Sequence, residues 1–334
     1  MKAMILAAGA GTRLYPLTAQ LPKPMVPVAN RPVLEHVMRA VTRHDFRELA
    51  INLSYLPQVI TAHFGDGAGH GARIHYSHEE EPLGTAGGVR KLADYWDDGT
   101  FLVIGGDDLT DMDLAAMLAF HRAHGGLATL ALYPVADPSR FGVVVTGPDG
   151  RVTAFQEKPP PQEARSNLCN MQVYLFEPAI LELIPEGFFD FGRQLFPALA
   201  AQGAPIYGYQ ATGYWRDIGS PEDYLAANVD FLCGHTNLAP PAGGRPDLGA
   251  GVQVVPPLCL GQGVMAHPGA MLGPNCVIGD GCEIHSGAKL SHCVLWPGVQ
   301  VKAGTVVSRA IVTPHCTVEV PPEGEQPCAP SGKA

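Results

Sequence analysis

A six-residue repeat near the C-terminus constrains the fold more than any other feature of this sequence. A large apolar side chain recurs at every sixth position, and a small residue precedes each one by two positions. A period of six fits neither a heptad nor simple strand alternation, so the pattern predicts a left-handed parallel β-helix. The apolar series is Leu272, Ile278, Ile284 and Leu290, and the small series is Ala270, Cys276, Cys282 and Ala288.

The phase of this repeat is not constant. It slips around residues 294–296 and partly returns at Val301 and Val307, so we expect a short or irregular coil. Because Cys276 and Cys282 fall in the small series, we interpret them as packing residues of the core and not as metal ligands.

The N-terminal stretch has the character of a phosphate-binding loop. Residues 4–6 form an apolar run, which predicts a strand buried on both faces of a parallel sheet. The small residues 7–11 follow, so backbone N–H groups can approach a triphosphate closely. Arg13 adds a rigid donor fork, and Lys23 adds a mobile charge between two prolines.

The common nucleotide-binding motifs, Gly-Lys-Ser/Thr and GxGxxG, do not occur in this loop. Instead, the string GAGTRLYPLTAQLPKPMVPVANRPVL at residues 9–34 resembles the signature of the sugar-1-phosphate nucleotidyltransferases, or NDP-sugar pyrophosphorylases. The resemblance implies an enzyme that uses Mg²⁺ and makes an NDP-sugar and pyrophosphate from an NTP and a sugar-1-phosphate. It implies nucleotide-binding roles for Leu6, Ala7, Ala8, Gly9, Gly11, Thr12 and Arg13, and catalytic roles for Arg13, Lys23 and Lys158.

The first two thirds of the chain alternate between strand and helix patterns. Helices are expected at 33–44 and 58–64, and strands at 49–53 and 73–77. This alternation predicts an α/β fold with a Rossmann-like, doubly wound mixed sheet, which would bind ligands at the carboxyl ends of its strands.

A second stretch, LGTAGG at residues 83–88, resembles another signature of the same family. The resemblance places Gly84 and Thr85 near the nucleotide and Glu79 near the base. An acceptor-only carboxylate suits the adjacent N1–H and amine of guanine, which favours GTP. For Glu80 and Glu81 a solvated loop remains an equal alternative.

The strand expected at 101–105 runs directly into two carboxylates. Carboxylate oxygens are the ligands that Mg²⁺ prefers, usually one or two together with substrate phosphates and water. Asp107 aligns with the family's metal aspartate, and Asp217 in the string WRDIG aligns with the second. Asp108 stands where relatives carry an aliphatic residue, and its role is left open between support of the metal site and simple exposure.

A third resemblance concerns the sugar phosphate. The string FQEKP at residues 155–159 implies that Glu157 binds sugar hydroxyls and that Lys158 binds the phosphate. Gly142 and Asn170 complete the expected sugar-phosphate site. Gln172 replaces a glycine that the family usually carries, which leaves the identity of the sugar open.

Three residues have the character of helix caps. Asp111 and Asp113 precede the helix expected at 114–121, and we interpret both as capping acids. Ser220 precedes a proline and an acidic third position, which predicts the start of a helix that reaches Phe231.

Composition limits the cellular role. The net charge of −10 gives no electrostatic footprint for nucleic acid or an anionic membrane. Because no apolar run reaches membrane-spanning length, we expect a cytoplasmic protein. The expected organisation is a catalytic domain at 1–234, a linker at 235–250, a β-helix at 251–322 and a disordered tail at 323–334, with a homo-oligomer formed through the β-helix.

Three functional hypotheses remain open. The favoured one is nucleotidyl transfer from GTP to mannose-1-phosphate, with glucose-1-phosphate uridylyl or thymidylyl transfer as its nearest alternatives. The second is a regulatory paralogue that binds an NDP-sugar without making it. The third adds acyl transfer by the β-helix, because hexapeptide enzymes often use a histidine base; the candidates are His267, His285, His292 and His315.

Overall fold

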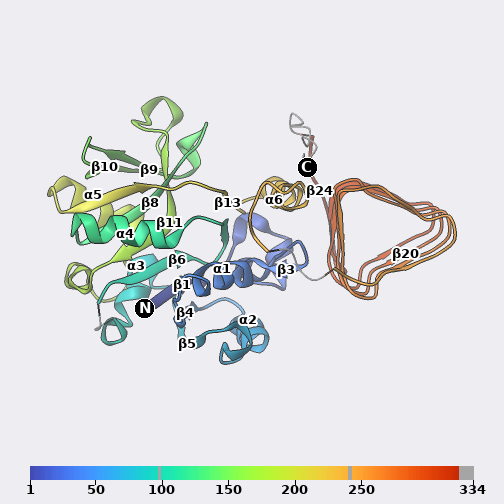
Figure 1. The fold of residues 1–334 in the computed structure, drawn as a ribbon, viewed down its shortest axis with the longest axis horizontal. Helices are drawn as coiled ribbons and strands as arrows, with labels where there is room; N and C mark the ends of the chain where they lie inside the picture. Colours follow the sequence, from blue (N-terminus) through green and yellow to red (C-terminus); the bar gives the residue numbers. More distant parts are fainter. Residues whose placement is uncertain (97–98, 240–242, 323–334) are drawn as a thin grey trace. The chain divides into compact units, whose positions relative to one another are not determined.

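The computed structural model describes residues 1–96, 99–239 and 243–322, which form two compact units (Figure 1). The first unit contains Met1–Ala10 and Val37–Trp215, and the second contains Gly11–His36 and the described residues from Arg216 onward. The domain boundaries expected at 234 and 250 stay predictions. The tail expected at 323–334 lies outside the described residues.

A mixed β-sheet forms the centre of the first unit. Within the described residues it has nine strands, in the order β10-β9-β11-β6-β1-β4-β5, with β8 beside β11 and β12 beside β8. Strands β5, β4, β1 and β6 are parallel, whereas β11 runs antiparallel to β6, β8 and β9, which confirms the predicted doubly wound mixed sheet. The strands are β1 Lys2–Leu6, β4 Glu48–Leu53, β5 Arg73–His78, β6 Phe101–Gly105, β8 Ala128–Pro134, β9 Gly142–Thr146, β10 Val152–Glu157, β11 Leu168–Phe176 and β12 Ile206–Gln210, with the short β7 Asp108–Thr110 and β13 Trp215–Asp217 outside this sheet.

The helices agree with the predicted periodicity to within a few residues. In the part of the chain that the structure describes, none is long and apolar enough to cross a membrane. The α-helices are α1 Val33–Thr42, α2 Pro57–Phe64, α3 Gly84–Arg90, α4 Leu114–His124, α5 Phe196–Ala201 and α6 Pro221–Leu232, and Phe191–Leu195 forms a π-helical turn. Short 3-10 turns lie at Thr12–Leu14, Leu17–Ala19, Lys23–Met25, Ala68–His70, Ala93–Tyr95, Pro138–Arg140, Pro161–Glu163 and Pro178–Leu183.

The order of the parallel strands fixes where a ligand can bind. β1 lies between β4, the next strand of this sheet along the chain, and β6, a later one, so the direction of winding reverses between β1 and β6. Such a reversal opens a crevice at the carboxyl ends of the two strands. The Gly106 N–H donates to the Leu6 carbonyl at 2.9 Å, so the loops that follow β1 and β6 start side by side.

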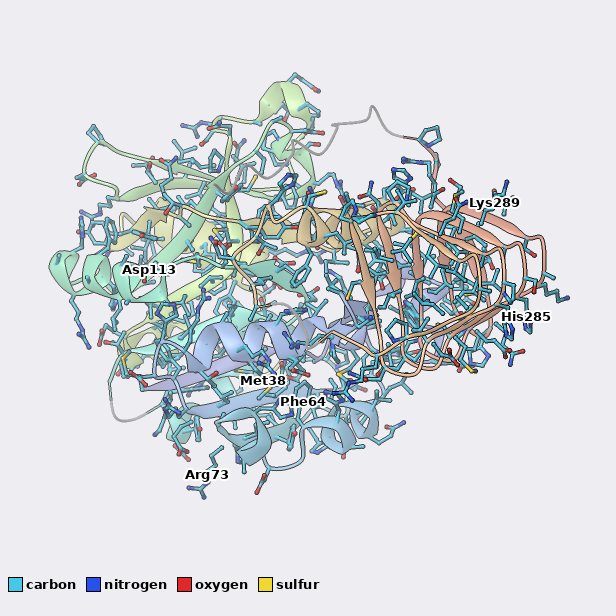
Figure 2. The ribbon with its side chains drawn as sticks, turned by 45° about the vertical axis from the view of Figure 1, so that its right-hand side comes forward. Met38, Phe64, Arg73, Asp113, His285 and Lys289 are labelled. Carbon is cyan, nitrogen blue, oxygen red and sulfur yellow. The ribbon has the colours of Figure 1, made fainter. Side chains whose placement is uncertain are left out.

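The two predicted capping acids have different roles. Asp113 accepts hydrogen bonds from the N–H groups of Ala115 and Ala116 and caps α4, as predicted (Figure 2). The capping role predicted for Asp111 is wrong, because its carboxylate accepts the Tyr214 N–H at 2.7 Å. A partner so distant in the sequence was not visible in the local pattern.

The repeat of the second unit forms coils of strands that trace a triangle in Figure 1, and all of them pair in parallel except the last, which pairs antiparallel; this is consistent with a β-helix. Strands of successive coils pair in parallel at a spacing of 18 residues, as Ala266 does with Ile284. The apolar and small residues of the predicted series are all buried in its core. The strands are β14 Asp247–Leu248, β15 Gln253–Val254, β16 Leu258–Leu260, β17 Met265–Ala266, β18 Met271–Leu272, β19 Cys276–Ile278, β20 Glu283–Ile284, β21 Lys289–Leu295, β22 Gln300–Val301, β23 Val306–Val312 and β24 Thr317–Glu319.

The predicted phase slip is a missing residue in one coil. Leu290 pairs with Leu272, 18 residues earlier, but Cys293 pairs with Cys276, only 17 residues earlier. The single long strand β21 therefore pairs with both β18 and β19, which are separate strands in the preceding coil. His292, inside that strand, takes a left-handed conformation with φ of 48°.

Helix α6 connects two parts of the second unit. The Ala29 N–H donates to Asn228 Oδ1 at 2.9 Å, and Tyr224 donates its hydroxyl proton to the Pro27 carbonyl. Pro27 and Ala29 belong to the turn region that contains β2 Pro27–Val28 and β3 Arg31–Pro32. Trp296 of the coil donates its indole N–H to the Tyr224 hydroxyl at 3.1 Å. Tyr224, near the start of α6, therefore contacts both the turn region and the coil.

We expect Ser220→Ala to reduce the free energy of unfolding by about 1 kcal/mol, because it removes the N-cap of α6. Ser220 Oγ accepts the Asp223 N–H at 3.2 Å and donates to the Asp223 carboxylate at 2.8 Å. Urea unfolding followed by circular dichroism measures the change. Ser220→Thr keeps the capping oxygen and should stay close to the wild type; equal stability of the alanine variant would contradict the prediction.

Candidate functional site

A row of hydrogen bonds joins the carboxyl ends of β1, β4 and β5. The Ala7 N–H donates to Asn52 Oδ1 at 2.8 Å, and Asn52 Nδ2 donates to Glu79 Oε1 at 2.8 Å. The second carboxylate oxygen of Glu79 accepts the Leu83 N–H at 2.9 Å. Asn52 and Glu79 are only 3% and 5% exposed. The row fixes the predicted base-binding carboxylate against the start of the predicted phosphate loop.

Sequence reasoning missed Asn52. The signal was available, because Asn52 interrupts the otherwise apolar run at residues 49–53 of β4. Glu80 and Glu81 are exposed, unlike Glu79, so the solvated-loop interpretation holds for these two.

The glycines of the second motif permit close packing. A Cβ at Gly87 would lie 2.2 Å from the Gly187 carbonyl oxygen, and one at Gly88 would lie 2.7 Å from Glu79 Oε1. Thr85 donates its hydroxyl proton to the Asp190 carboxylate at 2.9 Å and accepts the Phe191 N–H at 2.9 Å. The LGTAGG string thus fixes α3 against the 187–191 segment and beside Glu79.

The predicted phosphate loop divides between the two units. In the first unit, Gly9 and Ala10 are exposed, whereas the Ala7 N–H is already used by Asn52. In the second unit, Gly11 has φ of 63°, and a Cβ there would lie 2.6 Å from the Lys23 Cβ. Only glycine fits this position, because both the conformation and the space exclude a side chain.

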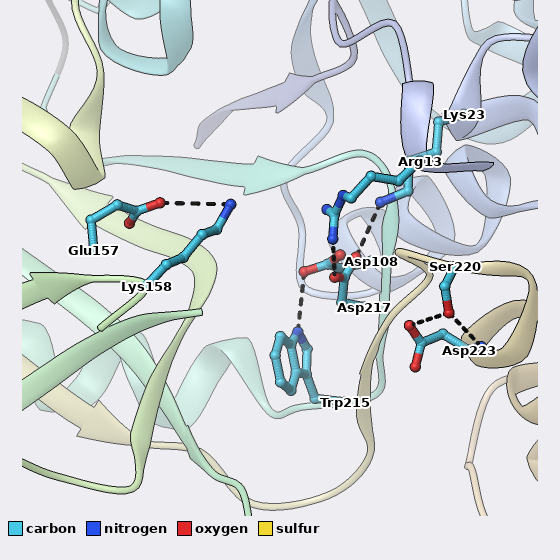
Figure 3. A network of polar contacts seen from close by, with 9 residues as sticks. All are labelled: Arg13, Lys23, Asp108, Glu157, Lys158, Trp215, Asp217, Ser220 and Asp223. Carbon is cyan, nitrogen blue, oxygen red and sulfur yellow. Dashed lines mark hydrogen bonds and ion pairs between the residues drawn. The ribbon is translucent and has the colours of Figure 1, made fainter. Parts of the chain in front are cut away.

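Arg13 and Lys23 converge on Asp217 in the second unit (Figure 3). Lys23 Nζ lies 3.1 Å from Asp217 Oδ1, and Arg13 Nη1 lies 3.8 Å from Oδ2. The Lys23 and Asp217 side chains are 8% and 13% exposed, whereas that of Arg13 is 59% exposed. A Cβ at Gly219 would lie 2.6 Å from the Asp217 carboxylate and 2.8 Å from Arg13 Nη1. The three predicted residues form one charged cluster with a net positive charge.

Asp107 and Asp108 follow β6 in the first unit but have different surroundings. A Cβ at Gly105 would lie 3.4 Å from Asp107 Oδ1 and 3.4 Å from the Gln172 side chain, so both side chains lie beside Gly105. Asp108 is buried, and its carboxylate accepts the Trp215 indole N–H at 3.3 Å (Figure 3). The alternative that Asp108 is simply exposed is therefore wrong.

Glu157 and Lys158 form an ion pair at the end of β10, with 3.8 Å between Lys158 Nζ and Glu157 Oε1 (Figure 3). The Glu157 carboxylate lies close to the backbone of Gly142 and Gly192, which leave no room for side chains. Burial raises the pKa of the Glu157 carboxyl above its ordinary value, and Lys158 partly opposes that rise. Lys158 itself has φ of 48°.

Asn170 supports an irregularity in β11. Its Oδ1 accepts the Gln172 N–H at 3.1 Å, and its Nδ2 donates to the Tyr174 hydroxyl at 2.7 Å. The register of β11 with β8 shifts between Asn170 and Tyr174, and Gln172 takes φ of 55°. A family glycine suits this left-handed position, and here the Asn170 amide stabilises a glutamine in it.

The predicted site residues divide between the units. The first unit contains Leu6, Ala7, Ala8, Gly9, Glu79, Gly84, Thr85, Asp107, Gly142, Glu157, Lys158 and Asn170, and the second contains Gly11, Thr12, Arg13, Lys23 and Asp217. The carboxylate oxygens among these residues are suitable ligand atoms for a hard divalent cation. Their roles in binding and catalysis remain predictions.

Comparison with known proteins agrees with the resemblance seen in the sequence. A family model described as nucleotidyl transferase matches residues 2–233, and one described as GMPPB C-terminal domain matches residues 254–321. The solved structure of HddC from Yersinia pseudotuberculosis complexed with GMP-PN is 26% identical, with a TM-score of 0.60 over 69% of this chain and 99% of that one. A putative glucose-1-phosphate thymidylyltransferase from Bacillus anthracis, 24% identical with a TM-score of 0.62 over 68% of this chain and 94% of that one, has the same fold.

Curated relatives include enzymes for two different nucleotides. The UTP–glucose-1-phosphate uridylyltransferase of Synechocystis is 40% identical over 68% of this chain, and the mannose-1-phosphate guanylyltransferase of Mycobacterium tuberculosis is 41% identical over 70%. The chain spans 62% and 65% of the length of these two relatives. A probable mannose-1-phosphate guanylyltransferase of Arabidopsis thaliana is 36% identical over 95% of this chain and 87% of its own. On these matches, the chain belongs to the nucleotidyl transferase family.

Proposed function

We propose that this chain is a sugar-1-phosphate nucleotidyltransferase whose substrates are GTP and mannose-1-phosphate. The observation that carries the proposal is the convergence of Arg13 and Lys23 on Asp217 in a member of this family. Transfer of a nucleotidyl group requires fixed positive charge around the leaving pyrophosphate, which such a cluster supplies.

No protein nucleophile is required. The sugar-1-phosphate oxygen attacks the α-phosphorus of the NTP, and pyrophosphate leaves on the opposite side. In this proposal Arg13 and the loop amides bind the β- and γ-phosphates, and Lys23 stabilises the developing charge. Lys158 binds the incoming phosphate, and its exposed ammonium group is available for this contact.

The proposed cofactor is Mg²⁺, held by Asp107 and Asp217. The donor set fits, because both residues offer carboxylate oxygens, and Asp107 is only partly buried at the carboxyl end of β6. A bound magnesium ion would neutralise phosphate charge and position the reacting groups. Asp217 also balances the buried charge of Lys23, so its role is not limited to the metal.

Guanine is the proposed base because Glu79 is a fixed, buried carboxylate. Each of its oxygens accepts one hydrogen bond from the protein and retains a second acceptor site. The guanylyltransferase names among the relatives and the GMP-PN complex of HddC support this choice. The Synechocystis relative supports UTP as the alternative base.

Glu157, Asn170 and Gly142 are proposed to contact the sugar. The Glu157 carboxylate, whose side chain is 30% exposed, is a suitable acceptor for hydroxyl groups, and Gly142 leaves it space. Gln172, beside Asp107, places a polar amide where the family usually has no side chain.

A cytoplasmic location and a homo-oligomer formed through the β-helix also remain proposals. Exposed apolar side chains of the β-helix support the homo-oligomer; they are Val254, Met265 and Val306.

The first experiment is a pyrophosphate-release panel with Mg²⁺, crossing five NTPs with mannose-, glucose- and N-acetylglucosamine-1-phosphate. We expect GTP with mannose-1-phosphate to be the best pair. Asp107→Ala and Asp217→Ala should each reduce its rate about a hundredfold or more, because transition-state charge is no longer neutralised. The exposed Asp94→Ala is the control. If no pair releases pyrophosphate but an NDP-sugar raises the melting temperature, the chain is instead a regulatory paralogue.

We expect Glu79→Gln to lower kcat/KM for GTP roughly tenfold, the value of one charge-assisted hydrogen bond, and to improve the relative use of UTP. Steady-state kinetics with both nucleotides measures the change in their ratio. Glu80→Gln is the matched control, because that neighbouring glutamate is exposed. A parallel loss with both nucleotides would show that Glu79 only supports the loop.

Glu157→Gln separates the stability and binding roles of Glu157. Because burial raises the pKa of this carboxyl, folding favours its protonated form, and the stability from that preference is lost as pH rises through the raised pKa. We therefore expect the variant to match the wild type at about pH 4 and to melt at a higher temperature at about pH 7. Its KM for the sugar-1-phosphate should rise roughly tenfold. The exposed Glu163→Gln controls for net charge; a lower melting temperature of Glu157→Gln at neutral pH would contradict this view.

A further inference from the structure

We propose that His267, Glu283 and His285 form a binding site for a divalent transition-metal ion of the Zn²⁺ type on the β-helix. Within the described residues, this is the one group of three or more potential ligand side chains whose donor atoms all lie within 4.8 Å of one another. Its residues and its donor set differ from those of the proposed magnesium site, Asp107 and Asp217.

The coil geometry places all three side chains together. Met265 pairs with Glu283 and Ala266 with Ile284, so His267 and His285 occupy equivalent positions in successive coils. Backbone hydrogen bonds fix both histidines, since the His267 N–H donates to Ile284 and the His285 N–H to Val301. Because side chains alternate along a strand, Glu283 and His285 point to the same side while Ile284 packs in the core. His285 lies on the outer surface of the coils in Figure 2.

The distances between donor atoms suit a tetrahedral ion. Glu283 Oε1 lies 2.8 Å from His267 Nε2 and 3.8 Å from His285 Nε2. Ligand atoms of a tetrahedral zinc ion are about 3.4 Å apart, given metal–ligand distances of about 2.1 Å. The two imidazole rings are stacked, with centroids 5.0 Å apart and an interplanar angle of 4°. To direct both Nε2 lone pairs at one ion, the two rings rotate about their side-chain bonds, which their exposure of 41% and 39% allows.

The donor set selects the class of metal. Two imidazoles and one carboxylate match zinc and similar first-row ions, whereas magnesium and calcium prefer oxygen ligands alone. Three protein ligands leave a fourth position for water or another ligand. The arrangement does not extend to the next coil, because Lys302 stands in register with His285 there. Such an ion would join two successive coils.

Zinc titration of the whole chain, first freed of metal with a chelator, tests the proposal. Isothermal titration calorimetry should show saturable Zn²⁺ binding by the wild type, and Co²⁺ should give the visible absorption of a tetrahedral complex. His267→Ala, Glu283→Gln and His285→Ala should each weaken binding roughly tenfold or more, because each removes one of three ligands. Zn²⁺ should raise the melting temperature of the wild type but not of these variants.

Two variants serve as matched controls. His315→Ala removes an exposed imidazole of the same unit, and Asp107→Ala removes a carboxylate of the proposed magnesium site. Both should bind Zn²⁺ like the wild type. The proposal is overturned if the wild type does not bind Zn²⁺ saturably, or if the three cluster variants bind it as tightly as the wild type. Melting of each variant without metal confirms that it is folded, so loss of binding reports the ligands themselves.

Discussion

The hydrogen bonds of Asn52 are the interaction on which the first unit's site depends. Its side-chain amide accepts a hydrogen bond from the Ala7 N–H, which follows β1, and donates one to Glu79, which follows β5. Because these three strands are neighbours, a single residue of the middle strand sets the relative positions of the phosphate loop and the proposed base reader. The Glu79 carboxylate is buried, so its hydrogen bonds also offset the desolvation of a polar group, and loss of one would cost several times the value of an exposed contact.

Left-handed residues are a second constraint, and they occur beside the proposed sugar-phosphate site. Lys158 and Gln172 both have positive φ, a conformation that costs a non-glycine residue roughly 1–2 kcal/mol. For Gln172 the Asn170 carboxamide offsets part of this cost, because it accepts the Gln172 N–H. Glycine would be unstrained at this position, so Gln172 places a long amide side chain beside Gly105 at a conformational cost that the Asn170 hydrogen bond offsets in part.

Local chemistry was predictable from the sequence, and long-range partners were not. The buried series from Ala270 to Leu290 and the caps at Asp113 and Ser220 follow from periodicity and from residue types near helix starts, which are local properties. Asp111 shows the limit, because its partner Tyr214 lies about a hundred residues away and the capping pattern around it was equally acceptable. The bonds from Asn52 to Glu79 and from Thr85 to Asp190 were missed for the same reason. Only the folded chain brings these residues into contact.

The molecule and its proposed substrates both carry negative net charge, and the Arg13, Lys23 and Asp217 cluster supplies positive charge locally. A chain with a net charge of −10 repels polyphosphates at long range, but salt screens that repulsion beyond about 10 Å. Lys23 is nearly buried, so its attraction for a bound phosphate is much less screened than that of a surface lysine. Its burial is tolerable only because Asp217 balances it, and the cluster still retains a net positive charge through Arg13. Phosphate affinity can therefore arise from short-range contacts in a chain whose overall field disfavours the ligand.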